Sequence, residues 1–470
     1  MISVFKLFST HQGKYVYDRE TNSILRITAE EYDAFKRIES LNSHEGDEAI
    51  LYSYRSKGYF SESQLENIEH PQDDLLEFHL SKRVEKITMQ VTQDCNLRCS
   101  YCSYTGGYDQ RTHSKKTMPL ETMFKTVDFI MQNSTDVKSI DIGFYGGEPL
   151  LEIDKIKETV CYIKENYPHK TVTHSLTTNG TIFTDKIIEF LFERGFNVLV
   201  SLDGPKELHD MNRVFADGSG SFETVMKNLK YIKHNFPAFF SKISFNTVVA
   251  PEHDFKCVSD YFSASDVIED NMLTIGLINL FNSHKPIQYN DMYFVHYQLQ
   301  RTKMLLAALG YINKEEVSKF LAVEIPILSR LYDSLGKQKN FPKTAHPGGP
   351  CIPGAMRPFV DIEGNIFPCE RVSESSKCMR IGNVFTGYDV TNARALLNIA
   401  LLTEDECKSC WNFIHCSLCC GSADDTGELS KSTRLSYCTS AKDSTLGKFL
   451  TICLLRENGY VFEESDFNVM

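Results

Sequence analysis

The stretch QDCNLRCSYC, residues 93–102, carries Cys95, Cys99 and Cys102 in a C-x3-C-x2-C spacing. It follows a β-branched run at residues 87–91 that predicts a strand. Three thiolates on one loop, with no obvious fourth Cys or His beside them, can hold three irons of a cubane cluster and leave the fourth iron open. A zinc knuckle that lacks one ligand, or chance clustering, is the alternative, although structural zinc sites are normally closed by four ligands. The spacing therefore favours an iron-sulfur site with an open position.

Short β-rich runs alternate with helical patterns after this loop, as far as about residue 280. The alternation predicts an α/β fold of βα units around a parallel sheet or partial barrel. In such folds the chemistry sits at the carboxyl ends of the strands. Strands are expected at residues 87–91, 139–144, 171–177, 197–202, 243–249 and 273–280. Helices are expected between them, at residues 120–133, 153–167, 185–195 and 221–236.

Residues 1–85 precede the barrel and contain no cysteine. Residues 13–18 and 23–28 are typical of a small hairpin. Thr28, with Glu31 three residues later, predicts a helix that begins with a capping box. These features indicate a compact N-terminal module of strands and helices.

The remaining domain boundaries are predicted from changes in composition and hydrophobic periodicity along the chain. Ser61 with Leu65 begins a second short helical pattern, and the charged, Pro-containing residues 69–83 suit a linker. Two or three helices are expected after the barrel, including residues 290–309 and 314–335. The chain then becomes rich in Cys, Gly, Pro and Ser, and a loop-rich segment of this kind is more naturally held by metal than by a hydrophobic core. The predicted divisions are an N-terminal module (residues 1–85), a partial barrel (86–280), a helical bridge (281–345), a Cys-rich domain (346–450) and a tail (451–470).

Seven cysteines of the Cys-rich domain follow fixed spacings. The pattern is C-x12-G-x4-C, then C-x2-C-x5-C-x3-C, then a last cysteine. A zinc ribbon built on two Cys pairs is the alternative, but five residues between the pairs are too few for a ribbon, and seven ligands divide badly into zinc tetrads. The seven are Cys351, Cys369, Cys407, Cys410, Cys416, Cys420 and Cys438.

The chain has 470 residues and a net charge of −12, from 50 Lys and Arg against 62 Asp and Glu. Bulk charge therefore does not draw it to nucleic acid or anionic membranes, although a local basic groove is compatible with this sum. The 15 cysteines are an odd number, so they cannot all pair within one chain. No secretory signal opens the sequence, and no apolar run of about 18 residues occurs. We predict a cytoplasmic protein with no nucleic-acid or membrane partner, whose clustered thiols serve metal binding or catalysis.

The first cysteine group and the alternation around it resemble the radical S-adenosylmethionine (SAM) superfamily over residues 86–280. The resemblance implies a partial (β/α)6 TIM-like barrel whose open iron binds the amino and carboxylate groups of SAM. The cluster then cleaves SAM to methionine and a 5′-deoxyadenosyl radical. The family's methionine-amine motif resembles Gly146, Gly147, Glu148 and Pro149, where glycines let the backbone approach the ligand and an acid complements an ammonium.

Seven further residues resemble cofactor-binding positions of the family. Ser201 and Arg213 are expected to face the SAM carboxylate, and Asn246 the ribose region. Taken singly, a strand-end Asp-Gly is usually a turn and an isolated Arg is usually a solvated charge. The seven are Tyr101, Thr178, Asn179, Ser201, Asp203, Arg213 and Asn246.

The second cysteine group resembles the SPASM domain, the auxiliary-cluster domain of radical enzymes that modify peptides and proteins. The resemblance implies that Cys407, Cys410, Cys416 and Cys438 hold an outer auxiliary [4Fe-4S] cluster. An inner auxiliary cluster would be held by Cys351, Cys369 and Cys420. Together with the SAM-binding cluster, three [4Fe-4S] clusters are expected.

The inner cluster still lacks a fourth ligand. Some family members supply a cysteine six residues after the first, and Arg357 stands at that position here. Cys378 or Cys419 can substitute, or the iron can be open and bind a substrate cysteine thiolate. The last three cysteines sit among apolar neighbours and are predicted to be buried core thiols. They are Cys161, Cys257 and Cys453.

Two features bear on the substrate. Residues 1–85 resemble the winged-helix-like module with which peptide maturases bind a precursor's leader as an added β-strand, whereas sulfatase-maturating relatives generally start close to the three-cysteine loop. In the sulfatase-maturating branch an Asp that follows the Cys369 position accepts a proton, and Glu370 stands there. It is a candidate general base, or else an ion-pair partner of Arg371.

We therefore predict a radical SAM maturase of a ribosomally synthesised precursor peptide with a leader. A hydrogen is abstracted from a core-peptide carbon, and a cysteine sulfur attaches there as a thioether. Carbon-carbon crosslinking, formylglycine formation on sulfatases, and a non-catalytic iron-sulfur or zinc-binding module are the alternatives. An electron donor such as flavodoxin or ferredoxin is the expected second partner.

Overall fold

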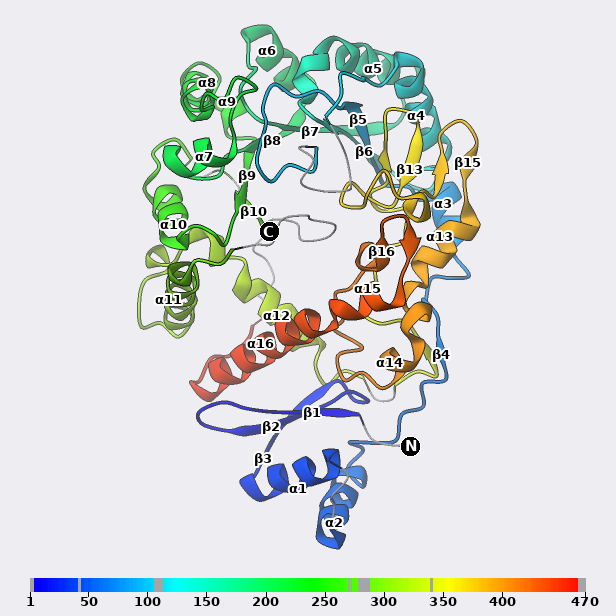
Figure 1. Cartoon of the computed structure of the whole chain (residues 1–470), viewed down its shortest axis with the longest axis vertical. Coiled ribbons are helices and arrows are strands. Elements are labelled where there is room, and N and C mark those ends of the chain that lie inside the picture. Colours follow the sequence, from blue (N-terminus) through cyan, green and yellow to red (C-terminus); the bar gives the residue numbers. More distant parts are fainter. Residues whose placement is uncertain are drawn as a thin grey trace.

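The computed structural model describes residues 4–40, 44–104, 113–268, 271, 273–277, 288–338 and 341–463. In Figure 1 the barrel helices surround the sheet in the upper part, and the N-terminal module lies at the bottom. Helix α16 (Cys438–Glu457) crosses between them.

Six parallel strands form the barrel and belong to one ten-stranded sheet, in the order β10-β9-β8-β7-β6-β5. Every strand that the sequence predicts in this region is present, which confirms the α/β fold with a central parallel sheet. Residues 278–280, predicted to end the last strand, lie outside the described residues. The strands are β5 (Lys86–Thr92), β6 (Ser139–Gly146), β7 (Thr171–Thr178), β8 (Phe196–Ser201), β9 (Ile243–Val249) and β10 (Leu273–Leu277).

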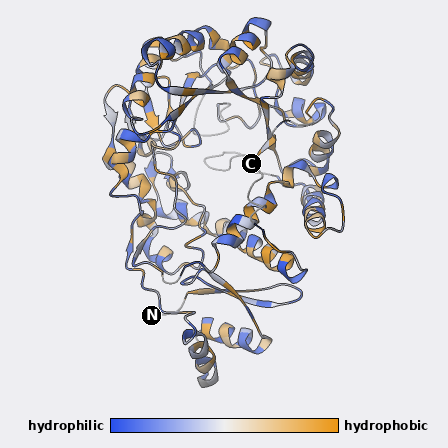
Figure 2. Cartoon of the chain, turned by 180° about the vertical axis from the view of Figure 1, so that it is seen from behind, coloured by the Kyte–Doolittle hydropathy of each residue, from blue (hydrophilic) through white to orange (hydrophobic). Residues whose placement is uncertain are grey.

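The helices lie on the outer side of this sheet (Figure 1). Four of them lie within two residues of their predicted bounds: α4 (Leu120–Gln132), α5 (Ile153–Asn166), α6 (Asp185–Glu193) and α8 (Phe222–Asn235). The others are η1 (Pro149–Glu152), α7 (Lys206–Asn212), α9 (Pro237–Phe240) and α10 (Phe255–Ala264). Apolar and polar residues alternate around these helices (Figure 2), so that one face of each can be buried.

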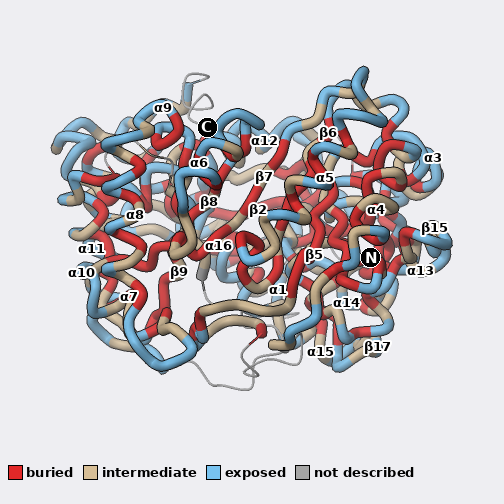
Figure 3. Tube along the Cα trace, turned by 90° about the horizontal axis from the view of Figure 1, so that it is seen from above, coloured by how far each residue is buried: buried red, intermediate tan, exposed pale blue. Residues whose placement is uncertain are grey.

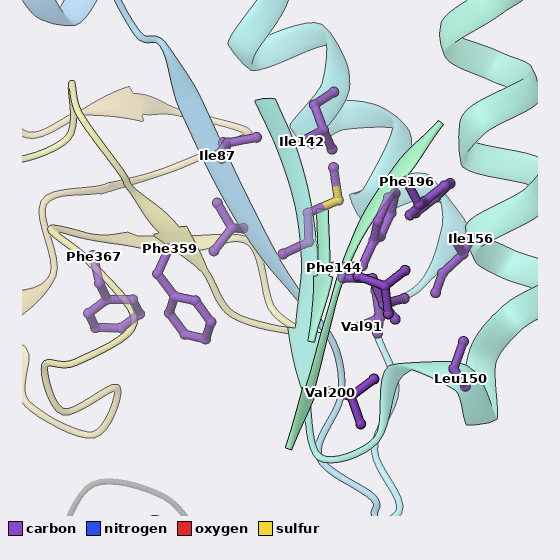
Figure 4. Close-up of a cluster of buried hydrophobic side chains, with 14 of the residues drawn as sticks. Ile87, Val91, Ile142, Phe144, Leu150, Ile156, Phe196, Val200, Phe359 and Phe367 are labelled. Carbon is purple, nitrogen blue, oxygen red and sulfur yellow. The ribbon is translucent and has the colours of Figure 1, made fainter. Parts of the chain in front are cut away.

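The core fills the space between the strands and the helices. Figure 4 shows Val91, Phe144 and Phe196 pointing toward Ile156 of α5. Buried residues follow the strands and exposed ones the outer turns (Figure 3). Since side chains alternate along a strand, Gln90 of β5 faces away from this core and toward the concave side of the sheet.

The N-terminal module is an antiparallel sheet of β1 (Phe5–Ser9), β2 (Lys14–Asp18) and β3 (Ser23–Ile27), followed by α1 (Ala29–Glu39) and α2 (Glu45–Arg55). The predicted hairpin and the capping box of Thr28 and Glu31 are both present. Its sheet packs on α16, where the rings of Tyr17 and Phe449 are 4.8 Å apart.

Two predictions near the barrel entrance are wrong. The segment from Ser61 is not helical, because it runs extended into β4 (Asn67–Ile68), which pairs with β11 (Thr344–Ala345) and buries Leu65. The predicted linker contains helix α3 (Leu76–Lys82). It is ordered because Leu76 and Leu80, four residues apart, enter the barrel core.

The bridge contains α11 (Asp291–Ala308) and α12 (Glu324–Ser334). The second helix is shorter than predicted, and residues 314–323 include two 3-10 turns, η2 (Lys314–Glu316) and η3 (Lys319–Leu321). Pro326 explains the difference, because a proline is tolerated in the first turn of a helix but not in its interior.

The Cys-rich segment is built from short elements and continues the barrel sheet. Strand β12 pairs in parallel with β5, and Phe359 and Phe367 belong to the same core as the barrel (Figure 4). The expectation that metal rather than a hydrophobic core holds this segment is therefore too strong. Its strands are β12 (Phe359–Val360), β13 (Asn365–Phe367), β14 (Gly382–Asn383), β15 (Gly387–Tyr388), β16 (Asp424–Asp425) and β17 (Glu428–Leu429). Its helices before α16 are η4 (Lys377–Met379), α13 (Val390–Leu397), η5 (Ile399–Thr403), α14 (Glu404–Lys408), η6 (Cys420–Ala423) and α15 (Lys431–Ser436).

Candidate functional site

The three-cysteine loop is held against the end of β6 by backbone contacts. Gly147 N–H donates to the Thr92 carbonyl at 2.8 Å, and Glu148 N–H donates to the Asp94 carbonyl at 2.9 Å. A Cβ on Gly146 would stand 2.2 Å from the Thr92 oxygen, and one on Gly147 would stand 2.0 Å from the Asp94 oxygen. Both glycines are therefore required by the approach of the chain's own loop.

Glu148 joins two strand ends. One of its carboxylate oxygens accepts hydrogen bonds from the Thr178 hydroxyl at 2.8 Å and the Leu150 N–H at 3.0 Å. The other accepts from the Asn179 N–H at 2.7 Å. Burial raises the pKa of this carboxyl to about 7, although the three donors act in the opposite direction. Pro149 begins the 3-10 turn that Glu148 caps. The carboxylate thus organises the ends of β6 and β7.

Asn179 connects Glu148 to Cys95, the first cysteine of the loop. Its amide donates to the Asn96 side-chain oxygen at 2.8 Å, and its nitrogen lies 3.7 Å from Cys95 Sγ. Leu97 N–H donates to the same sulfur at 3.3 Å. Polar hydrogens therefore already point at the sulfur of Cys95, as they do around cluster-ligating thiolates, whose properties they tune.

A buried ion pair lies on the other side of the loop. Arg213 Nε is 2.9 Å from Asp203 Oδ2, and their side chains are 8% and 2% exposed. The Tyr101 hydroxyl donates to the same Asp203 oxygen, and the Arg213 guanidinium lies 5.4 Å from the Tyr101 ring centre. Val248 N–H donates to the second Asp203 oxygen at 3.1 Å. Three residues that the sequence singles out separately thus form one network.

Ser201 and Asn246 are paired in register at the ends of β8 and β9. Leu202 N–H donates to the Asn246 carbonyl at 2.9 Å, which fixes the two strand ends together. Side chains at these positions alternate with Val200 and Phe245 of the core and face the concave side of the sheet. The predicted cofactor-binding residues therefore gather at the carboxyl edge of the parallel sheet.

Cys95, Cys99 and Cys102 lie close enough for their charges to interact. Burial raises the pKa of Cys95 to about 12 and that of Cys99 to about 11, and a bound cation would deprotonate such thiols. Among the described residues, no three His, Cys, Asp or Glu side chains converge on one point as a single-ion site requires.

Residues 89–262 match the family model of the Radical SAM superfamily. These residues form a radical SAM domain. The cofactors of this family are a [4Fe-4S] cluster and SAM, and the open three-cysteine loop with the polar edge around it fits both. When bound, the cluster and SAM supply a carbon-centred radical to the site.

The chain is similar to two kinds of radical SAM protein. It is 27% identical over 311 residues to the radical SAM cyclopropyl synthase TigE of Paramaledivibacter caminithermalis, over 61% of each chain. It is 26% identical over 370 residues to a cysteine-type anaerobic sulfatase-maturating enzyme of Clostridium perfringens, over 75% of this chain and 93% of that enzyme. A solved structure of anSMEcpe with bound AdoMet and the Kp18Cys peptide covers 79% of this chain and 99% of its own, at 19% identity and a TM-score of 0.56. This last likeness concerns the fold.

The predicted outer auxiliary set comes together in the Cys-rich segment. The thiols of Cys407, Cys410 and Cys416 lie close enough to interact electrostatically, and Cys438 lies close to Cys410 and Cys416. Arg19 of the N-terminal module, fully buried, donates to the Lys408 carbonyl at 2.6 Å within this loop. The set fits an auxiliary cluster.

The predicted inner set also comes together, and a fourth cysteine lies with it. The Cys420 thiol interacts with Cys351 and Cys369, and it shares a hydrogen bond with the Cys419 thiol. Cys378 does not point to this group, because its sulfur contacts the Asp424 carboxylate at 3.6 Å and Ser376 Oγ at 3.2 Å. Of the two substitutes considered from the sequence, Cys419 lies beside the inner set, whereas the sulfur of Cys378 contacts Asp424 and Ser376.

Arg357 lies close to the inner set. Its charge interacts with Cys351 and Cys369, and it forms two contacts with Glu370, one of them from Nε to Oε2 at 3.3 Å. Arg371 Nε is farther away, at 4.0 Å from Glu370 Oε1. Glu370 is thus engaged by Arg357, a partner that lies 13 residues away and that the sequence interpretation did not consider.

Of the three cysteines that were predicted to be buried in the core, only one is buried. Cys453 is buried, whereas Cys161 and Cys257 are exposed on α5 and α10. Both exposed cysteines lie on amphipathic helices, where a residue next to an apolar one can still face solvent.

One carboxylate group of the site was missed from the sequence. Glu374, between Cys369 and Cys378, accepts hydrogen bonds from Gln90 Nε2 at 2.7 Å and Gln93 Nε2 at 3.5 Å. Gln90 also donates to the Tyr104 hydroxyl at 2.8 Å. A long polar side chain within a predicted barrel strand, such as Gln90, was the available signal.

Proposed function

We propose that this protein is a radical SAM maturase that modifies a precursor peptide by linking a cysteine sulfur to a carbon of another residue. The observation that carries the proposal is the inner cysteine set, in which Arg357 stands where some relatives have a fourth cysteine. A guanidinium there favours a nearby thiolate electrostatically, so it suits a substrate cysteine that approaches the cluster.

The residues of the first site have separate tasks in this proposal. Cys95, Cys99 and Cys102 hold the SAM-binding cluster, and the Asp203–Arg213–Tyr101 network and the Ser201–Asn246 edge hold SAM. The glycines and Glu148 fix the cysteine loop to the strand ends. Their common effect is to hold the reacting carbon of the peptide close to where the radical is supplied.

The N-terminal module is proposed to bind the leader of the peptide. Strands β1 and β3 each have only β2 as a ladder partner among the described residues, so either edge offers main-chain groups for an added strand. The buried Arg19 links this module to the outer cysteine loop. We further propose a cytoplasmic enzyme that is reduced by a flavodoxin or a ferredoxin. No helix within the described residues is long and apolar enough to cross a membrane.

The test is co-expression with a short Cys-containing open reading frame from the genomic neighbourhood. We expect the peptide to lose two hydrogens and to resist thiol alkylation, and fragment-ion spectra to map the thioether to one cysteine and one carbon. Titration of the purified enzyme with the same peptide should shift the spectrum of the inner cluster. An unchanged mass with an intact leader and active SAM cleavage would contradict thioether formation.

Formylglycine formation is the second candidate, and the similarity over 93% of the Clostridium perfringens sulfatase-maturating enzyme favours it. That enzyme class would be revealed by conversion of a short leaderless Cys peptide to an aldehyde that reacts with a hydrazide probe. A product that has lost two hydrogens but keeps a reactive thiol would instead indicate a carbon-carbon bond, as the similarity to a cyclopropyl synthase allows.

A further inference from the structure

Arg434 on α15 is a buried cation, only 1% exposed, that has no carboxylate partner among the described residues. Two other arginines are buried in the described part of the chain, and each of them forms an ion pair, Arg19 with Glu20 and Arg213 with Asp203. An unpaired charge is strongly disfavoured inside a protein. Arg434 therefore needs negative charge from a source other than a carboxylate.

The hydrogen bonds of Arg434 leave one of its nitrogens unused. Nη1 donates to the Cys419 carbonyl at 3.1 Å and to the Ser422 hydroxyl at 3.2 Å. Nε donates to the Thr403 hydroxyl at 3.3 Å. Nη2 is buried and has no hydrogen-bond partner among the described residues. Because buried donors are normally satisfied, this free N–H group indicates where an anion is missing.

Asp424 is the buried acid nearest to Arg434 in the sequence, but the two do not form an ion pair. Asp424 Oδ1 accepts hydrogen bonds from the Ser376 hydroxyl at 2.9 Å and from the Gly427 N–H at 3.1 Å. The other oxygen, Oδ2, has no hydrogen-bond partner within the described part of the chain. Direct contact with Asp424 therefore does not neutralise Arg434.

Arg434 lies beside the outer cysteine set. Its partner Thr403 also contacts Cys407, with 3.3 Å between the hydroxyl oxygen and the sulfur. Since the hydroxyl oxygen accepts from Arg434, its hydrogen is available to Cys407 or to the Ala400 carbonyl at 3.4 Å, and a thiolate is the stronger acceptor. Burial raises the pKa of Cys407 and Cys416, and the positive charge of Arg434 opposes this rise at both thiols. The unused nitrogen thus belongs to a cation that borders the proposed cluster.

The charge of an iron-sulfur cluster explains what such a cation does. A [4Fe-4S] cluster held by four thiolates is an anion, and reduction adds a further negative charge. A positive charge nearby and a hydrogen-bond donor on a ligating sulfur both favour the reduced form. Arg434 supplies the charge, and Thr403 supplies the donor. Lys442 also lies close to Cys410 and Cys416, but its side chain is partly exposed, so water screens its charge more strongly.

We propose that Arg434 is the counter-charge of the outer auxiliary cluster and that, together with Thr403, it raises the reduction potential of this cluster. In the reduction one electron enters from the electron donor, and no proton is transferred. Arg434 is a positioning residue in this role, because it acts through the Thr403 hydroxyl and through its charge. The inference rests on the proposed outer ligand set, which is Cys407, Cys410, Cys416 and Cys438, and not on the thioether chemistry.

The test is a redox titration of the full-length reconstituted enzyme with dithionite, without peptide, followed by electron paramagnetic resonance. The outer cluster is recognised as the signal that Cys410→Ala removes together with about four irons per chain. For Arg434→Met we expect the iron content of the wild type. Its reduction equilibrium should shift about tenfold toward the oxidised cluster, which is a fall of about 60 mV for one electron.

Three further variants separate charge from structure. Arg434→Lys keeps the positive charge and should stay close to the wild-type potential. Thr403→Val keeps the charge but removes the hydroxyl donor, so it should lower the potential by less than Arg434→Met does. Lys431→Met is the matched control, because it removes a charge from the same helix at a side chain that is 48% exposed. Its potential should equal that of the wild type.

Three outcomes overturn the inference: a wild-type potential for Arg434→Met with full iron content, an equal fall in Lys431→Met, or an equal fall in Arg434→Lys. If Arg434→Met loses the outer cluster, Arg434→Gln takes its place, because it is neutral but keeps hydrogen-bond donors. A lower potential or iron content in Arg434→Gln than in Arg434→Lys supports the counter-charge, and equal values overturn it. Failure of thioether formation leaves these results unchanged, since no peptide is present. A wild type without the signal assigned through Cys410→Ala would overturn the outer cluster and the role of Arg434 together.

Discussion

Gly147 lies directly against the Asp94 carbonyl, so that a Cβ at position 147 would stand 2.0 Å from the Asp94 oxygen and 3.2 Å from the Cβ of Cys95. No side chain rotation can relieve the first clash, because both partners are backbone. We expect Gly147→Ala to displace the cysteine loop, so that the variant binds about four fewer irons per chain and no longer cleaves SAM. Iron analysis and the yield of 5′-deoxyadenosine measure this.

Gly447 provides the matched control for that substitution. It lies within α16, and a Cβ there would meet nothing within 4 Å. Gly447→Ala should keep the iron content and SAM cleavage of the wild type and raise the unfolding free energy by up to about 1 kcal/mol through helix propensity. Equal iron contents in the two variants would contradict the role given to Gly147.

Arg213 neutralises a carboxylate that has almost no access to water. Asp203 is 2% exposed, and removal of Arg213 would leave its charge buried and unpaired. We expect Arg213→Met to lower the unfolding free energy by ~3–5 kcal/mol. Lys256→Met is the control, because the Lys256–Asp260 pair is more than half exposed on both sides and its loss should leave the stability nearly unchanged. Anaerobic denaturant titration would separate the two cases, and similar losses would argue against a buried pair.

The inner cysteine set gives a prediction about ligand number. If a substrate thiolate completes this cluster, Cys419→Ala should keep the iron content and the spectral shift on addition of peptide. Cys420→Ala should lose about four irons per chain. Cys161→Ala, on the exposed side of α5, controls for loss of any thiol. A loss of iron or of the peptide-dependent shift in Cys419→Ala would mean that the chain itself closes the cluster, because Cys419 lies beside Cys420.

The barrel was predictable because its signals are local. Each βα unit has a strand pattern, in which apolar residues recur at every second position, and then a helix pattern, in which they recur about every 3.6 residues. Thr28 with Glu31 specifies the start of a helix within four residues. The two cysteine groups could be divided by spacing and family resemblance. Contacts between distant segments could not be predicted this way, since no local pattern relates Arg357 to Glu370 or Glu374 to Gln90.

The errors have the same origin. The segment after Ser61 has a helical pattern, but pairing with residues 344–345 gives its backbone a different set of hydrogen bonds. Residues 69–83 have the composition of a linker. They nevertheless form a helix, because Leu76 and Leu80 pack into the barrel core. Gly147 lies against the backbone of Asp94, in the loop that carries Cys95, and this contact between distant segments could not be predicted from the sequence either.

His174 gives a prediction about pH. It lies in β7 beside Phe196 and Phe144, with ring centres 5.1 and 6.4 Å away, and burial lowers its pKa to about 4. Because this pKa lies below the ordinary value of 6.5, the unfolded chain binds the proton first as the pH falls. The stabilising contribution is therefore complete above about pH 6.5 and is lost as the pH falls toward 4.

We expect His174→Phe to remove this pH-dependent contribution while keeping an aromatic ring between its neighbours. Between pH 7 and pH 5 the wild type should lose ~2 kcal/mol more unfolding free energy than the variant does. Urea titrations at the two pH values measure the difference, with His234→Phe on the exposed side of α8 as the control. A control that flattened the pH dependence as much as His174→Phe would contradict the argument, because the argument rests on the burial of His174.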